Sequence, residues 1–107
     1  MRLRIALSAR RGLDTIFDYW SERAGTQVAE RLIDNITERF WLIAQFPRSG
    51  KQGPQIAPGV RCFPAGKYLI YYTVSRGTLQ IVHIFHGAQD QKQAFRSAKK
   101  RHEREAP

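Results

Sequence analysis

Residues 58–90 read PGVRCFPAGKYLIYYTVSRGTLQIVHIFHGAQD. They predict three consecutive β-strands, the first ending at residues 61–63, the second over 67–75 and the third over 78–86. The second strand is rich in aromatic and β-branched residues, which strands favour. The connection Ser75-Arg76-Gly77 places a glycine where a positive φ is needed, so the last two strands are expected to form an antiparallel hairpin.

Two amphipathic helices are predicted upstream of these strands, after a short N-terminal strand over residues 2–8. In the first helix, over about 10–23, one apolar stripe holds Leu13, Ile16, Phe17 and Trp20. The second helix, over about 27–45, carries Val28, Leu32, Ile36, Phe40 and Ile43 and is ended by Pro47. A link of two or three residues makes the pair an antiparallel αα-hairpin, whose stripes need the sheet to cover them.

The predicted fold class is therefore α+β. The expected order is an N-terminal strand, the αα-hairpin, a three-stranded antiparallel sheet and a short C-terminal helix over about 91–102, with the helices packed on one face of the sheet. Residues 48–57 are expected to form a loop. All of 1–107 is expected to be one domain, with a basic tail from about residue 99.

The charge balance predicts an anionic partner. The chain carries 18 Lys and Arg against 9 Asp and Glu, a formal net charge of +9. A field of this sign attracts nucleic acids and acidic proteins alike. The single cysteine, Cys62, cannot form an internal disulfide, and no apolar run approaches the ~18 residues of a membrane helix. We therefore expect a cytoplasmic protein that does not enter a membrane.

The candidate reactive groups are cationic and imidazole side chains. The three histidines lack cysteine or carboxylate partners at ligand spacing, so neither a metal site nor another cofactor is expected. Metal-free RNA cleavage needs a base, an acid and fixed cations near one phosphate. The residues of suitable type are Arg61, Lys67, His83 and His86.

Strand geometry already constrains that set. Arg61 and Lys67 flank a turn, which allows them to lie close together on adjacent strands; the alternative is that they are two ordinary solvated cations. In a regular strand His83 shares a face with Ile81 and Phe85, whereas His86 shares the opposite face with Val82 and Ile84. The two histidines therefore serve one site only if a bulge or the strand end redirects one of them.

The order of these elements resembles the RelE/ParE superfamily of bacterial toxins from type II toxin–antitoxin modules. The sheet looks like the ParE branch, through a PG-R motif, a G-K-Y-hydrophobic-I-Y-Y run and a terminal H-G-A-x-D. Matching positions are Pro58, Gly59, Arg61, Tyr68, Tyr72, Ile81, Val82, His86, Gly87, Ala88 and Asp90. Upstream, Phe46, Pro47 and Gly50 fit a looser pattern. His83 and Gln89 depart from the sheet pattern of the ParE branch, which usually has arginine at both positions.

The resemblance implies a toxin that inhibits DNA gyrase by stabilising its cleaved-DNA complex and so arrests growth. Such a toxin is a binding protein rather than an enzyme. The alternative is a RelE-like, ribosome-dependent mRNA endoribonuclease that works without metal through Arg61, Lys67, His83 and His86. The ribonuclease branch commonly uses a tyrosine or histidine near its C-terminus, and no tyrosine follows Tyr72. The two missing arginines keep open a third possibility, a decayed toxin that still binds its antitoxin.

The resemblance also implies a partner, an acidic antitoxin that wraps the sheet and the helix groove in a hetero-oligomer. The residues expected to contact the antitoxin are Leu13, Phe17, Trp20, Trp41 and Tyr72. Those expected to contact the target, which is gyrase or alternatively the ribosome and its mRNA, are Arg48, Lys51, Arg61, Lys67 and His86.

Overall fold

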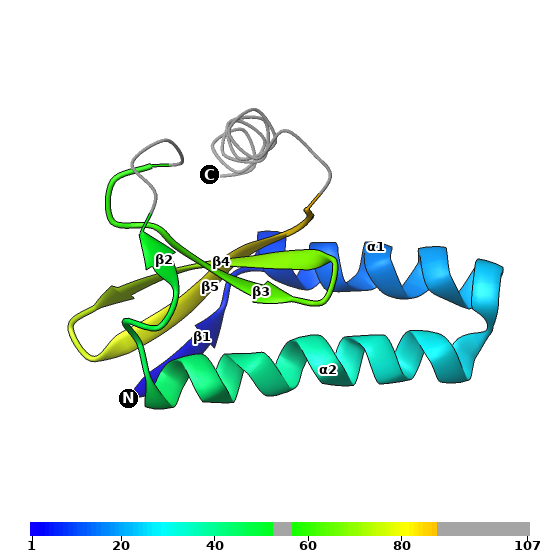
Figure 1. Cartoon of the computed structure of the whole chain (residues 1–107), viewed down its shortest axis with the longest axis horizontal. Helices are drawn as coiled ribbons and strands as arrows, with labels where there is room; N and C mark the ends of the chain where they lie inside the picture. The colour runs from blue at the N-terminus through cyan, green and yellow to red at the C-terminus, as the bar shows by residue number, and fades with distance from the viewer. Residues whose placement is uncertain (53–56, 88–107) are drawn as a thin grey trace.

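The computed structural model describes residues 1–52 and 57–87, in which two helices lie against a mixed β-sheet (Figure 1). The predicted C-terminal helix lies outside the described residues. The elements, in chain order, are β1 (Arg2–Ile5), α1 (Leu7–Ala24), α2 (Thr26–Gln45), β2 (Lys51–Gln52), β3 (Arg61–Ala65), β4 (Tyr68–Ser75) and β5 (Thr78–His86). The α+β class and the helical hairpin predicted from periodicity are confirmed.

The sheet has five strands in the order β1-β5-β4-β3-β2 rather than the predicted three. Strand β1 pairs parallel with β5, and the other neighbours pair antiparallel. The parallel pair is possible because the αα-hairpin provides a long crossover between the first and the following strands. Strand β2 lies within the predicted loop 48–57. Its two residues, Lys51 and Gln52, are too few to show any alternation.

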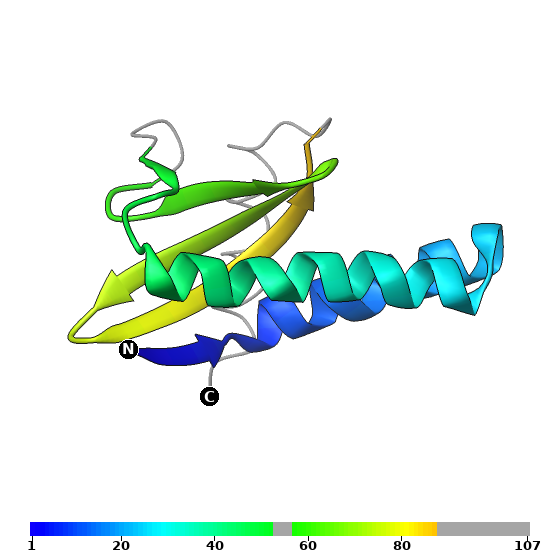
Figure 2. The ribbon, with the colours of Figure 1, turned by 60° about the horizontal axis from the view of Figure 1, so that its bottom comes forward.

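The main core lies between the helices and one face of the sheet, as predicted. Figures 1 and 2 show α1 and α2 side by side along this face. Besides the buried Tyr72, six large side chains without polar atoms in this core are at most 1% exposed, namely Ile36, Phe40, Ile43, Ile70, Leu79 and Ile81. Burying each contributes about 1.5–3 kcal/mol. None of the helices in residues 1–52 and 57–87 has the length and hydropathy to cross a membrane.

A β-bulge in β5 changes which side chains share a face. Tyr71 pairs with His83 but Tyr72 pairs with Ile81, so Val82 is the extra residue. His83 therefore lies on the face of Tyr71, away from the helices, whereas Ile81 points into the main core. The expectation that His83 shares a face with Ile81 was wrong, because the bulge resets the alternation at Val82.

The β4–β5 hairpin matches its sequence prediction. Its two central residues both have positive φ, 51° at Arg76 and 75° at Gly77. A two-residue loop of this kind suits the right-handed twist of the flanking strands. The turn closes β4 onto β5 with Ser75 opposite Thr78.

A smaller apolar cluster covers the sheet face opposite the helices. Val60 and Tyr71 are buried there, with Cys62, Leu69, Val82 and Phe85 packed against them. Burial raises the pKa of the Cys62 thiol to about 11, although the nearby positive charge of Lys51 acts in the opposite direction. The thiol is therefore protonated at neutral pH.

This pKa predicts slow alkylation of Cys62 in the folded protein. The thiolate is the reactive form, so at pH 8 iodoacetamide should label the native chain about 100-fold more slowly than the urea-unfolded chain. The native rate should rise about tenfold for each pH unit between 8 and 10. Mass spectrometry of quenched samples measures both rates. Equal rates in the two states would show that the thiol is not shielded.

Candidate target-binding groove

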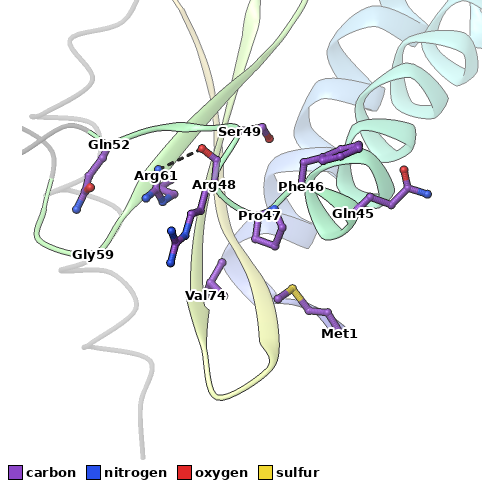
Figure 3. Close-up of a pocket in the computed structure, with 10 residues that line it drawn as sticks. All are labelled: Met1, Gln45, Phe46, Pro47, Arg48, Ser49, Gln52, Gly59, Arg61 and Val74. Atoms are coloured by element: carbon purple, nitrogen blue, oxygen red, sulfur yellow. Dashed lines mark hydrogen bonds between the residues drawn. The ribbon is translucent and has the colours of Figure 1, made fainter.

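A groove of about 940 Å³ opens where the C-terminal end of α2 meets the N-terminus and the strands β2, β3 and β4 (Figure 3). Apolar, polar and cationic side chains all contribute to its wall. The lining residues are Met1, Gln45, Phe46, Pro47, Arg48, Ser49, Gln52, Gly59, Arg61 and Val74. Because they come from distant parts of the chain, this surface exists only in the folded protein.

Tyr72 anchors the loop that forms one side of this groove. Its side chain is fully buried, and its hydroxyl donates to the carbonyl oxygen of Pro47 and accepts from the N–H of Gly50, both at 2.8 Å. Burial raises the pKa of Tyr72, against the lowering effects of the Gly50 hydrogen bond and the Arg61 charge. The hydroxyl therefore stays protonated at neutral pH and can donate its hydrogen bond to the carbonyl oxygen of Pro47.

Arg61 holds the same loop from the groove side. Its half-buried guanidinium donates to the carbonyl oxygen of Gly50 at 2.9 Å. It also donates to the carbonyl oxygen of Arg48 at 3.4 Å (Figure 3). Both bonds use Nη1, one of the guanidinium nitrogens that together carry five N–H donors. Arg61 thus fixes the backbone of Arg48, whose own side chain is exposed. The two arginines line one groove.

Large apolar side chains are exposed in and beside the groove. Phe46 is 60% exposed, Met1 59% and Val74 40%, and all three line it. Trp41 and Leu42, one turn earlier on α2, are 64% and 39% exposed. An apolar patch with a cationic rim is typical of a protein-binding surface. Hydrophobic periodicity did not identify Phe46, Met1 and Val74 as surface residues of a site, because each lies at the end of an element where periodicity carries no information.

The five predicted target-binding residues separate into two groups. Arg48 and Arg61 line the groove, and Lys51 lies next to it on β2. Lys67 and His86 lie at the opposite end of β4, where the carbonyl oxygen of Lys67 accepts from the N–H of Gly87 at 2.7 Å. The proximity of Arg61 and Lys67 that the turn allowed is not observed. Arg61 pairs with Tyr72 and the turn follows Ala65, so about 13 Å of strand separates the two cations.

The four residues of the ribonuclease hypothesis do not converge on one point. His83 is 5% exposed and stacks on Phe85, with ring centroids 5.3 Å apart, on the face away from the helices. His86 pairs with Tyr68 on the helix-covered face, where the two rings make an edge contact at 5.4 Å. The sheet therefore separates the two histidines. No cluster of three potential metal ligands occurs within the part of the chain that the structure describes.

The residues predicted to contact an antitoxin have very different exposures. Trp41 is 64% exposed, whereas Leu13 and Trp20 are half-buried against the main core. The indole N–H of Trp20 donates to the hydroxyl of Tyr68 at 2.8 Å. Phe17 is also half-buried. Tyr72 has no exposed surface, so its contribution to this region is the support of the Pro47–Gly50 loop.

Comparisons with known proteins agree on one class of toxin. The family model described as ParE toxin of type II toxin–antitoxin system, parDE, matches residues 3–91. Toxin ParE1 of Mycobacterium tuberculosis is 29% identical over 90 residues, which are 83% of this chain and 92% of that protein. Toxin ParE3 of Caulobacter vibrioides is 28% identical over 75 residues, 70% of this chain and 75% of that protein.

A solved structure supports the same conclusion. A chain of the chromosomal ParDE toxin–antitoxin system from P. aeruginosa superposes with a TM-score of 0.73 at 25% identity. The superposition covers 80% of this chain and 95% of that chain. The likeness therefore extends over nearly the whole of the solved chain.

Proposed function

This chain belongs to the ParE toxin family of type II toxin–antitoxin systems, and from this premise we propose that it arrests growth by poisoning DNA gyrase. It acts in the cytoplasm as a binding protein that stabilises the cleaved-DNA complex of gyrase. A ligand shifts an equilibrium only by its differential affinity for the two states. The toxin therefore binds gyrase more tightly when the DNA is cleaved than when it is intact.

The groove is the observation that carries this proposal. It offers two arginines beside Phe46, Met1 and Val74, which suits a partner with both apolar and acidic groups. A toxin that acts by binding needs such a surface and no catalytic set. The separation of His83 from His86, and of Arg61 from Lys67, favours binding over RNA cleavage.

We also propose that a cognate antitoxin neutralises this toxin. The antitoxin is acidic where it touches the chain, because the toxin carries a formal net charge of +9. Its contact covers exposed apolar surface such as Trp41, which is 64% exposed. Since almost all of the toxin has to be bound, the dissociation constant of the complex is nanomolar or lower. This corresponds to a binding free energy of about −12 kcal/mol or stronger. The two proteins form a hetero-oligomer.

The test compares two purified reactions with the full chain added to each. One measures supercoiling and DNA cleavage by gyrase, and the other measures mRNA integrity on translating ribosomes. We expect inhibited supercoiling, accumulated cleaved DNA and intact mRNA, with all effects reversed by an equimolar amount of antitoxin. Cleavage of mRNA with unaffected gyrase would replace this proposal by the ribonuclease alternative. Inactivity in both reactions would rule out gyrase as the target.

A further inference from the structure

The two layers of the fold differ sharply in charge. All six carboxylates within the described residues lie on the two helices, as Asp14, Asp18 and Glu22 on α1 and Glu30, Asp34 and Glu38 on α2. The strands and loops in residues 1–6, 46–52 and 57–87 carry seven Lys and Arg and no carboxylate. The sheet and its loops therefore have an unbalanced positive charge.

Five of those cations lie between the middle of β4 and the β4–β5 turn, and we call this set the cationic end: Arg2, Arg48, Lys51, Arg61 and Arg76. Pairing of β1 with β5 brings Arg2 to the β4–β5 turn, where its N–H donates to the carbonyl oxygen of Gly77 at 2.9 Å. Arg76 lies in the same turn. The groove links this turn to the other cations, since Met1 and Val74 line it together with Arg48 and Arg61.

The spread of the cationic end indicates an extended polyanion. Arg48 and Arg61 line the groove, whereas Arg2, Lys51 and Arg76 lie outside its wall. An acidic peptide confined to the groove would contact only Arg48 and Arg61 of this set, because these two line the groove. Duplex DNA carries one negative charge for about every 1.7 Å of its axis, so it can neutralise cations spread over a whole surface. Arginine is suited to phosphate contacts, because its planar guanidinium donates to two oxygens at once.

We propose that the cationic end binds the phosphate backbone of duplex DNA. This proposal deepens the proposed function and rests on it. Because gyrase acts on DNA, a toxin with this contact would hold the DNA segment as well as the enzyme. The contacts are to phosphates, so binding is independent of base sequence and weakens steeply with salt. The binding itself is measurable without gyrase.

The experiment measures fluorescence anisotropy of a labelled DNA duplex of about 20 base pairs, titrated with the full chain between about 50 and about 200 mM salt. The test variant is Arg48→Gln/Lys51→Gln. The control variant is Arg10→Gln/Arg31→Gln, which removes two exposed cations from the helices and so has the same net charge. Residues 88–107 contribute six further Lys and Arg that are identical in all three proteins.

We expect the test variant to reduce the slope of log K against log salt by about two, and the control to leave it unchanged. Equal losses from both variants would overturn the proposal, since net charge alone would then account for binding. Absence of duplex binding by the wild type at low salt would also overturn it. If the wild type binds polyglutamate but not the duplex, the partner of the cationic end would be an acidic protein instead.

A parallel gyrase supercoiling assay separates this inference from the proposed function. If the toxin inhibits gyrase but does not bind the duplex, gyrase remains the proposed target and the DNA contact is rejected. If duplex binding is weakened by Arg48→Gln/Lys51→Gln but the toxin does not inhibit gyrase, the DNA contact is supported and gyrase is rejected as the target. Urea denaturation of the three proteins should give similar midpoints, because the substituted side chains are exposed.

Discussion

Replacing Gly50 with alanine is expected to lower the free energy of unfolding by about 2–3 kcal/mol. A Cβ at this position would overlap the phenol ring and hydroxyl of Tyr72. Tyr72 is fully buried and bonded to Pro47 and Gly50 itself, so it cannot move aside without losing those bonds. Overpacking a filled site costs about 1–3 kcal/mol, and a displaced hydroxyl adds an unsatisfied buried group.

Urea denaturation followed by circular dichroism measures this loss, and Gly12→Ala is its matched control. Gly12 lies within α1, and a Cβ there would meet its nearest atom, the carbonyl oxygen of Ile84, at an ordinary 3.5 Å. Alanine is favoured over glycine inside a helix by about 1 kcal/mol, so the control variant should be as stable as the wild type or more so. A Gly50→Ala protein with unchanged stability would show that Tyr72 does not hold the Pro47–Gly50 loop.

Replacing Arg48 with glutamate should weaken gyrase inhibition at least tenfold without unfolding the protein. The Arg48 side chain is exposed, and its hydrogen bond with Arg61 uses the Arg48 carbonyl oxygen, which every residue has. The substitution places a carboxylate beside the remaining guanidinium in the groove. The carboxylate at position 48 then repels an acidic partner that the guanidinium of Arg48 attracted. A tenfold loss corresponds to about 1.4 kcal/mol of binding free energy.

The measurement is the toxin concentration that halves the supercoiling activity of gyrase, for Arg48→Glu and for the control Arg31→Glu. Arg31 is an exposed residue of α2, so both variants change the net charge equally. We expect the control to inhibit gyrase as the wild type does. Equal weakening by the two substitutions would show that total charge, rather than the groove, governs affinity for the target.

Hydrophobic periodicity was sufficient to predict the helices and the main strands. The stripe of α2, including Ile36, Phe40 and Ile43, forms the fully buried side of the core. The β4–β5 hairpin followed from Gly77 and from β-branched and aromatic residues on both sides of it. These features are local, since each depends on residues within about one or two turns or one strand of each other.

Features that depend on pairing between distant segments were not predictable. The parallel pairing of β1 with β5 and the two-residue strand β2 depend on contacts with segments far along the chain. The bulge at Val82 shifted the faces of Ile81 and His83 without any glycine or proline to mark it. A one-residue shift reverses the face of every side chain on one side of it.

The sequence by itself determined the α+β class, the helical hairpin and the positive net charge, because these follow from local patterns and composition, and its motifs carried the resemblance to a toxin family. Only the tertiary structure decided which cations meet. Strand register places Arg61 beside the Arg48 loop and away from Lys67, and the Tyr72 hydroxyl fixes that loop against the core. A groove assembled from the N-terminus, the end of α2 and three strands has no sequence pattern of its own, since its residues meet only when the chain folds.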